Sequence, residues 1–207
     1  MDISTRENPR TTPAPTTPLK LAVILSSNRQ GRFGPVIGDW FLEHARQSAD
    51  FDVELIDLAE EDLPTALTST PAPSVADSLG RVTPALAAAD AFVVITPEYN
   101  HSFPASIKSL IDWHFSEWRA KPIGFVSYGG VSGGLRAVEQ LRQVFAEMHA
   151  ATIRDTVSFH NPHGDFDDQG RHADPAACDA AATSMLGQLA WWGLALRDAR
   201  AVRPYDS

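Results

Sequence analysis

The stretch from Phe92 to Trp113 constrains the fold of this chain more than any other segment. It opens with the apolar run Phe92–Ile95, which is typical of a strand buried on both faces of a parallel sheet. Pro97 has no N–H for a sheet ladder and should end this strand, whereas Pro104 suits the first turn of a helix. The segment therefore predicts a strand, a polar and aromatic loop, and a helix. Such a loop lies where open α/β sheets bind ligands.

The same alternation of strand and helix recurs along the chain. The expected strands are Leu19–Leu25, Phe51–Leu58, Phe92–Ile95, Pro122–Ser127 and Thr152–Phe159. The expected helices begin near Pro35, Pro84, Pro104 and Pro175, and an apolar stripe from Val138 to Met148 marks one more. Five alternations predict a parallel sheet with right-handed crossovers, but they leave the strand order open.

Two of these segments carry finer expectations. Ala59–Leu79 is acidic and then rich in Pro, Ser and Thr, so it is expected to be a long loop. Thr83 should then cap a short helix that begins at Pro84. In the last helix, the residues expected to face inward are Met185, Leu189, Trp192 and Leu196.

Composition narrows the class of protein. A chain of 207 residues is expected to form one domain. The net charge of −9 and pI of about 5.1 argue against binding to nucleic acid or to an anionic membrane. The single cysteine, Cys178, allows no internal disulfide and indicates a reducing compartment, hence the cytoplasm. Residues 1–18 are polar, rich in Pro and Thr, and expected to be a disordered arm.

The loop after the first strand, Ser26–Gly34, has the composition of an anion site. It contains Arg29 and Arg32, several polar side chains and no carboxylate, and it leads directly into a helix. A helix N-terminus and arginine side chains both bind phosphate oxygens. The alternative is an exposed turn whose arginines pair with surface carboxylates. The loop is neither a Walker loop nor a Gly-x-Gly-x-x-Gly fingerprint.

Two further loops should reach the same edge of the sheet. In Pro97–Phe103, Tyr99 and Asn100 could wrap a planar ring, although Tyr99 and Phe103 could instead cover the core. Ser127–Gly134 is rich in glycine and allows a ligand to approach the backbone, although it could equally be a flexible turn.

Three other features are interpreted as structural. Arg136 is expected to be a solvated helix residue near Glu139 and Gln140. Cys178 is expected to be a small packed side chain. The histidines and aspartates of His160–Asp174 loosely resemble a calcium loop, but the glutamate required at the twelfth position is Ala176, so a polar turn is favoured over a metal site.

The loop Pro97-Glu98-Tyr99-Asn100, between an apolar strand and a Pro-initiated helix, resembles the NADPH-dependent FMN reductase family. The family's first loop, Gly-Ser-x-Arg, is matched by Ser26–Arg29, with Ser26 in place of the glycine. The resemblance runs from about Leu19 to about Leu196. It implies a flavodoxin-like α/β fold over residues 19–200: a three-layer sandwich whose five-stranded parallel sheet has the order 2-1-3-4-5, with helices on both faces.

The resemblance also implies which residues bind FMN. Ser27, Arg29 and Arg32 would hold its phosphate, and the second and third loops would receive its ring. The full expected set is Ser27, Arg29, Arg32, Phe33, Gly34, Pro97, Glu98, Tyr99, Asn100, His101, Ser127, Tyr128, Gly129 and Gly130. No side chain need act as an acid or a base, because the flavin carries the chemistry.

The activity implied is that of an FMN-dependent NAD(P)H oxidoreductase. It would pass a hydride from NADPH or NADH through FMN to a quinone, azo compound, flavin or metal oxyanion, by a ping-pong mechanism. The alternatives are a flavodoxin-type carrier of single electrons and an FMN-binding scaffold without turnover. A homodimer or homotetramer is expected, with Phe103, Trp113 and Trp118 near the subunit interface.

Overall fold

The computed structural model describes residues 17–167 and 169–205, so most of the expected N-terminal arm, residues 1–16, lies outside the described part. Strands and helices alternate in the order β1 (Leu19–Leu25), α1 (Gly34–Gln47), β2 (Phe51–Asp57), α2 (Pro73–Ala88), β3 (Ala91–Pro97), α3 (Ala105–Trp113), β4 (Pro122–Gly129), α4 (Leu135–Glu147), β5 (Ala151–His160) and α5 (Pro175–Val202). Two short 3₁₀ helices, η1 (Ser116–Trp118) and η2 (Pro162–Gly164), lie in the connections.

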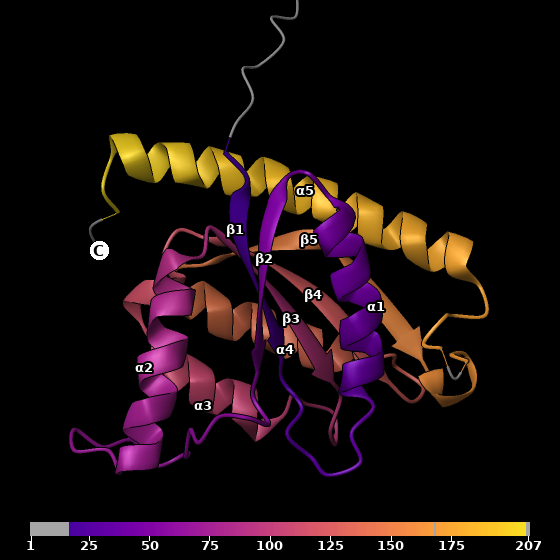
Figure 1. Cartoon of the computed structure of the whole chain (residues 1–207), viewed down its shortest axis with the longest axis horizontal. Helices are drawn as coiled ribbons and strands as arrows, with labels where there is room; N and C mark the ends of the chain where they lie inside the picture. The colour runs from indigo at the N-terminus through magenta and orange to yellow at the C-terminus, as the bar shows by residue number, and fades with distance from the viewer. Residues whose placement is uncertain (1–16, 168, 206–207) are drawn as a thin grey trace, which may run out of the picture.

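All five strands pair in parallel in the order β2-β1-β3-β4-β5, which confirms the expected fold (Figure 1). Alternate residues of a strand point to opposite faces of the sheet. In β1, Leu21, Val23 and Leu25 therefore enter a core shared with α1 and α5, whereas Ala22 and Ile24 enter a core shared with α2, α3 and α4. The sheet is the middle of three layers, and the carboxyl ends of its strands meet at one edge.

The last seven residues of the segment expected to be a long loop, 73–79, belong to helix α2, so the prediction was wrong for that part of the segment. The helix begins at Pro73 and continues through Pro84, which was expected to start it. Proline inside a helix costs about 3 kcal/mol. The apolar side chains Val75, Val82 and Leu86 are buried on one face of α2, and each such burial is worth about 1.5–3 kcal/mol. Packing against the sheet thus outweighs the lost hydrogen bond.

Helix α5 also departs from expectation. Met185 and Leu189 are fully buried, as predicted, but Trp192 is 39% exposed beside Trp191, which is 64% exposed. The two indole rings meet edge to face at 5.3 Å between centroids. Within the described residues, no helix is both long enough and apolar enough to span a bilayer.

Candidate functional site

A cleft of about 330 Å³ opens at the carboxyl edge of the sheet, within the usual size range of ligand pockets. All three loops singled out in the sequence line it. The predicted site residues that line it are Arg29, Arg32, Phe33, Pro97, Glu98, Tyr99, Tyr128, Gly129 and Gly130. A fourth loop, after β5, contributes Asn161, Pro162 and His163, which sequence reasoning had assigned to a polar turn. This fourth loop could have been predicted from its position, because it follows a strand and therefore lies at the same carboxyl edge of the sheet as the other three loops.

The remaining predicted residues, Ser27, Gly34, Asn100, His101 and Ser127, do not line the cleft but support its walls. The buried hydroxyl of Ser27 lies 2.7 Å from the hydroxyl of Tyr99, which ties the first loop to the second. The hydroxyl of Ser127 donates to the carbonyl of Gly133 at 2.9 Å. These bonds fix loop geometry, so Ser27 and Ser127 act on the cleft through their neighbours.

The two arginines of the first loop lie in different surroundings. Arg32 donates two hydrogen bonds of 2.5 Å to Asp57, at the end of β2, and one of 2.6 Å to the carbonyl of Ser27. The hydrogen bonds to Asp57 raise the pKa of the Arg32 guanidinium above its usual range. Arg29 makes no ion pair with any residue that the structure describes, yet it also lines the cleft. Arg29 is therefore the cation available to an anionic ligand.

The second loop turns through a pair of left-handed residues. Asn100 and His101 have φ values of 50° and 73°, and the backbone N–H and C=O groups of Tyr99 and Ser102 bond to each other across the turn. Asparagine adopts this conformation more readily than most residues. The turn leaves the Tyr99 hydroxyl against Ser27 of the first loop, while Tyr99 also lines the cleft.

The third loop is tightly packed against the second. Gly133 and Gly134 have φ values of 60° and 87°, and a Cβ on Gly134 would lie 2.8 Å from the backbone N of Tyr128, so side chains are excluded there. Gly129 does not have a positive φ. A Cβ on Gly129 would instead meet the backbone N of Gly134 at 3.1 Å and the Cβ of Glu98 at 3.3 Å.

Arg136 is exposed on α4, as expected, but it also takes part in this contact. Its guanidinium lies 2.6 Å from the Glu98 carboxylate, whose side chain is only 6% exposed. Glu98 also accepts hydrogen bonds from the hydroxyl of Ser132 at 2.5 Å and from the backbone N–H of Arg136 at 3.2 Å. Glu98 thereby joins the second and third loops at the floor of the cleft.

Replacement of Glu98 by glutamine should lower stability near neutral pH. Burial raises the pKa of Glu98, but the hydrogen bonds from Ser132 and Arg136 outweigh burial, and the net pKa is lowered. A lowered pKa contributes stability above the unfolded-state value, and this stability is lost as pH falls through the folded-state value. The difference in melting temperature between wild type and Glu98→Gln should therefore be largest near pH 7 and shrink below about pH 4. A difference independent of pH would contradict this assignment.

Comparison with known proteins decides the family. The model of the NADPH-dependent FMN reductase family matches residues 19–164. An NAD(P)H-dependent FMN reductase of Schizosaccharomyces pombe is 34% identical over 141 residues, covering 64% of this chain and 69% of that protein. The chain belongs to the NADPH-dependent FMN reductase family.

Other members and structures extend the comparison. An NADPH:quinone oxidoreductase of Arabidopsis thaliana is 35% identical over 92 residues, covering 42% of this chain and 47% of that protein. The structure of FerB, a flavoenzyme NAD(P)H:(acceptor) oxidoreductase from Paracoccus denitrificans, superposes with a TM-score of 0.69 at 21% identity, covering 84% of this chain and 97% of that one. At this level of identity, the similarity to FerB shows a shared fold.

The cleft has the groups that an FMN reductase needs to hold its cofactor. Arg29 offers a cation beside the start of α1, which suits a phosphate. Phe33, Tyr99 and Tyr128 provide aromatic surface for a planar ring. The Tyr128 hydroxyl is buried and has no hydrogen-bond partner among the described residues, and a Cβ on Gly34 would lie 2.9 Å from it. An unsatisfied buried hydroxyl at the wall of a cleft indicates a polar ligand atom.

Replacing Tyr128 with phenylalanine tests this fit without turnover. Burial raises the pKa of Tyr128, so its hydroxyl remains protonated and able to donate. A buried hydroxyl without a partner costs roughly 1–3 kcal/mol, so the cofactor-free variant should melt at the same temperature as wild type or higher. Its affinity for FMN should fall. Unchanged FMN affinity would show that the hydroxyl does not face the ligand.

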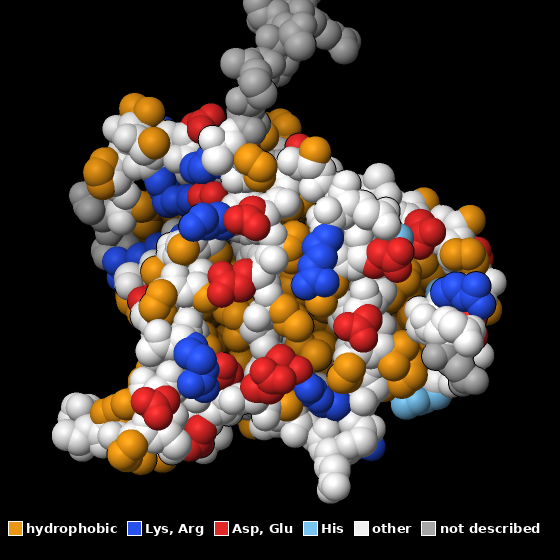
Figure 2. Space-filling model, viewed as in Figure 1, with side chains coloured by type: hydrophobic (Ala, Val, Ile, Leu, Met, Phe, Trp, Pro, Cys, Tyr) orange, Lys and Arg blue, Asp and Glu red, His pale blue; other side chains and the backbone are white. Residues whose placement is uncertain are grey.

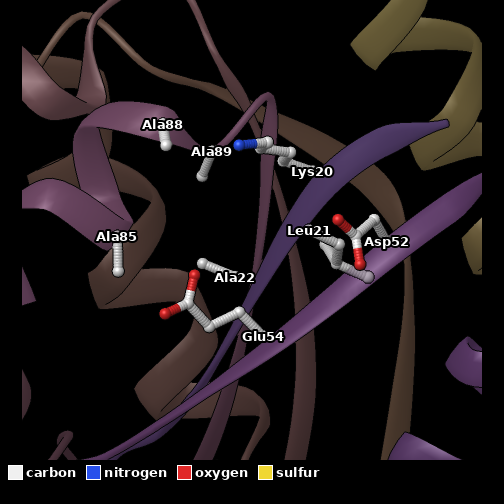
Figure 3. A pocket seen from close by; sticks show the side chains of 8 residues that line it. All are labelled: Lys20, Leu21, Ala22, Asp52, Glu54, Ala85, Ala88 and Ala89. Atoms are coloured by element: carbon white, nitrogen blue, oxygen red, sulfur yellow. The ribbon is translucent and has the colours of Figure 1, made fainter. Parts of the chain in front are cut away.

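Neither a second hollow nor a metal site offers an alternative place for the cofactor among the described residues. A hollow of about 160 Å³ lies toward the opposite ends of β1 and β2; Figure 3 shows Ala85, Ala88 and Ala89 on one side of it, facing Lys20, Asp52 and Glu54. It has no aromatic wall, and its carboxylates would repel a phosphate. Within the described residues, no group of His, Cys, Asp or Glu side chains is arranged to hold a metal ion.

Proposed function

We propose that the cleft binds FMN and that the chain is an FMN-dependent NAD(P)H oxidoreductase. The observation that carries the proposal is the convergence of an available arginine, aromatic walls and glycine backbone at the carboxyl edge of the sheet, in a member of this family. Bound FMN would supply the redox chemistry, accepting two electrons from a nicotinamide nucleotide and passing them to an acceptor.

The protein's own residues would bind and orient the cofactor. Arg29 would hold the phosphate, while the contact of Ser27 with Tyr99 and the pairing of Arg32 with Asp57 keep the first loop in place. The backbone around Tyr99, Asn100, Gly129 and Gly130 would border the ring. We assign this binding function to residues 19–200 and no acid or base role to any side chain.

The mechanism proposed is ping-pong, because the described residues form one sheet with one such cleft and no separate nucleotide domain. NAD(P)H and the acceptor would then use the same space in turn. Initial rates measured with NADPH against p-benzoquinone, methyl red and free FMN should give parallel double-reciprocal lines for the acceptors that are used. Intersecting lines would show that both substrates bind together. No NADPH oxidation with any acceptor would favour the electron-carrier alternative.

We also propose that the protein is a homo-oligomer of the cytoplasm, a compartment in which the unpaired Cys178 would stay reduced. Of the three residues expected near the interface, Trp118 was wrong, because it is fully buried in the monomer's own core. Phe103 and Trp113 are partly buried, and their place near an interface stays a prediction. The exposed pair Trp191 and Trp192 on α5 is a better candidate, since aromatic residues are enriched in interface cores.

Sedimentation equilibrium tests the oligomer. Wild type at micromolar concentration should give a mass at least twice 22.5 kDa, and Trp191→Arg should shift it toward the monomer. A wild type that sediments only as a monomer would contradict the proposal.

A further inference from the structure

Two adjoining cavities lie at the end of the sheet opposite the cleft that is proposed to bind FMN. They are about 350 and 330 Å³ in volume and adjoin one another, sharing Arg200, Pro204 and Tyr205 as lining residues. Lys121 and Ala151, at the amino ends of β4 and β5, also line them. The cleft lies at the other ends of these strands, and eight residues of β4 at about 3.3 Å each separate the two sites by roughly 25 Å.

The walls of this pair are apolar and aromatic. The aliphatic part consists of Ala87, Ala120, Ala150, Ala151, Leu196, Ala199 and Pro204. Tyr205 is 46% exposed, and its hydroxyl lies 3.0 Å from Nδ1 of His149, which also lines the larger cavity. Phe115 does not line the cavities, but its exposed ring stacks on the guanidinium of the lining residue Arg119, 4.4 Å from the ring centroid.

Positive charge is concentrated at the same place, although the chain as a whole has a net charge of −9. Arg119, Lys121, Arg200 and Arg203 line the two cavities, and Glu117 is the one carboxylate among the described residues that line them. A second carboxylate, Asp90, lies behind the cavities, 3.2 Å from Arg200. Figure 2 shows Lys and Arg side chains gathered between the C-terminal end of α5 and α2.

The residues that the structure describes neutralise these cations only in part. Lys121 is only 7% exposed, and its Nζ donates to the carbonyls of Leu86 and Ala87 rather than to a carboxylate. Burial, followed by the charge of Arg200, lowers the pKa of Lys121 to about 8. The Nε of Arg119 is buried and has no hydrogen-bond partner among the described residues. A buried donor without an acceptor is costly, so an acceptor supplied by a ligand would be stabilising here.

We propose that these two cavities form a binding site for an aromatic carboxylate, separate from the flavin cleft. The carboxylate would lie among Arg119, Lys121 and Arg203, which make no ion pair with any carboxylate among residues 17–167 and 169–205. The ring would lie against Tyr205 and the aliphatic wall. Inorganic phosphate would leave the apolar wall uncovered, and a neutral ring would leave the buried donors unsatisfied, so each should bind more weakly.

The test uses FMN-loaded protein and 2-naphthoate as the probe, with binding measured by isothermal titration calorimetry. Arg119→Gln and Arg203→Gln should each weaken binding roughly tenfold or more, because each removes a charged partner of the carboxylate. Arg154→Gln is the matched control, since Arg154 is exposed on β5 and does not line the cavities. Equal affinity in all four proteins would overturn the proposal.

Two further titrations locate the probe and define its chemistry. Naphthalene-2-carboxamide and inorganic phosphate should bind at least tenfold more weakly than 2-naphthoate. The affinity for 2-naphthoate should be the same in Arg29→Ala, loaded with enough FMN to saturate it, as in wild type. If 2-naphthoate instead competes with NADPH in steady-state reduction, the probe occupies the flavin cleft and the second site is refuted.

Discussion

Replacement of Arg29 by alanine is expected to weaken FMN binding about thirtyfold or more. Arg29 lines the cleft and makes no ion pair with a described residue, so its charge is available to the phosphate. Loss of one partner from a hydrogen-bonded charge pair costs on the order of 2–5 kcal/mol. The measurement is the dissociation constant of FMN by fluorescence quenching or calorimetry, with Arg154→Ala as the control for loss of an exposed arginine.

Riboflavin provides the internal comparison, because it lacks the phosphate. It should bind wild type poorly, and Arg29→Ala should not weaken it further. Arg32→Ala should behave differently, since Arg32 is held by Asp57 and secures the loop. It should lower the melting temperature as well as FMN affinity. If Arg29→Ala weakens FMN and riboflavin equally, Arg29 does not bind the phosphate.

Substitution of Gly129 by valine is expected to abolish most NADPH-driven flavin reduction while FMN remains bound. The new Cβ would lie 3.1 Å from the backbone N of Gly134 and 3.3 Å from the Cβ of Glu98, contacts that force the second and third loops apart. The phosphate site on the first loop is not part of this contact. The backbone N–H groups of these two loops would border the flavin ring, where negative charge develops on reduction. Hydrogen-bond donors stabilise such charge only when they are correctly placed. A shift of the loops should therefore reduce turnover more than cofactor affinity.

The readout is the rate of flavin bleaching by NADPH in stopped flow, normalised to the FMN content of each preparation. Gly187→Val on α5 is the matched control, because a Cβ there meets nothing within 4 Å. Full FMN occupancy with an unchanged bleaching rate in Gly129→Val would make Gly129 an ordinary turn glycine and remove the third loop from the site.

The fold was largely predictable because short apolar runs in the sequence mark its strands. Runs such as Phe92–Ile95 are buried on both faces, and each of them is a strand in the structure. The helix α2 was not predictable by the same reasoning. A proline is usually found in the first turn of a helix, so the sequence around Pro84 predicts a helix start. The helix instead continues past Pro84 because Val82 and Leu86 are buried against the sheet. The prediction for Trp192 was wrong because its neighbour Gly193 takes the inward position, where α5 packs closely on Leu19 of β1.

The site was predictable to the level of its loops but not of its contacts. The sequence places Arg29 and Arg32 side by side, yet Asp57 holds only Arg32, and it comes from a different strand 25 positions away. Glu98 and Arg136 are likewise brought together by the register of β3 and β4. Asn161 and His163 carry no family signature, and only the pairing of β5 with β4 places them beside the cleft.

Anaerobic mixing of the FMN-loaded protein with NADPH tests the central claim most directly, because it asks whether the cofactor in this cleft takes electrons from a nicotinamide nucleotide. Our account predicts rapid, complete bleaching of the flavin absorbance and its return when p-benzoquinone is added. It also predicts that Arg29→Ala will bleach in proportion to the FMN it retains. A protein that binds FMN tightly but is not bleached by NADPH or NADH would contradict the account.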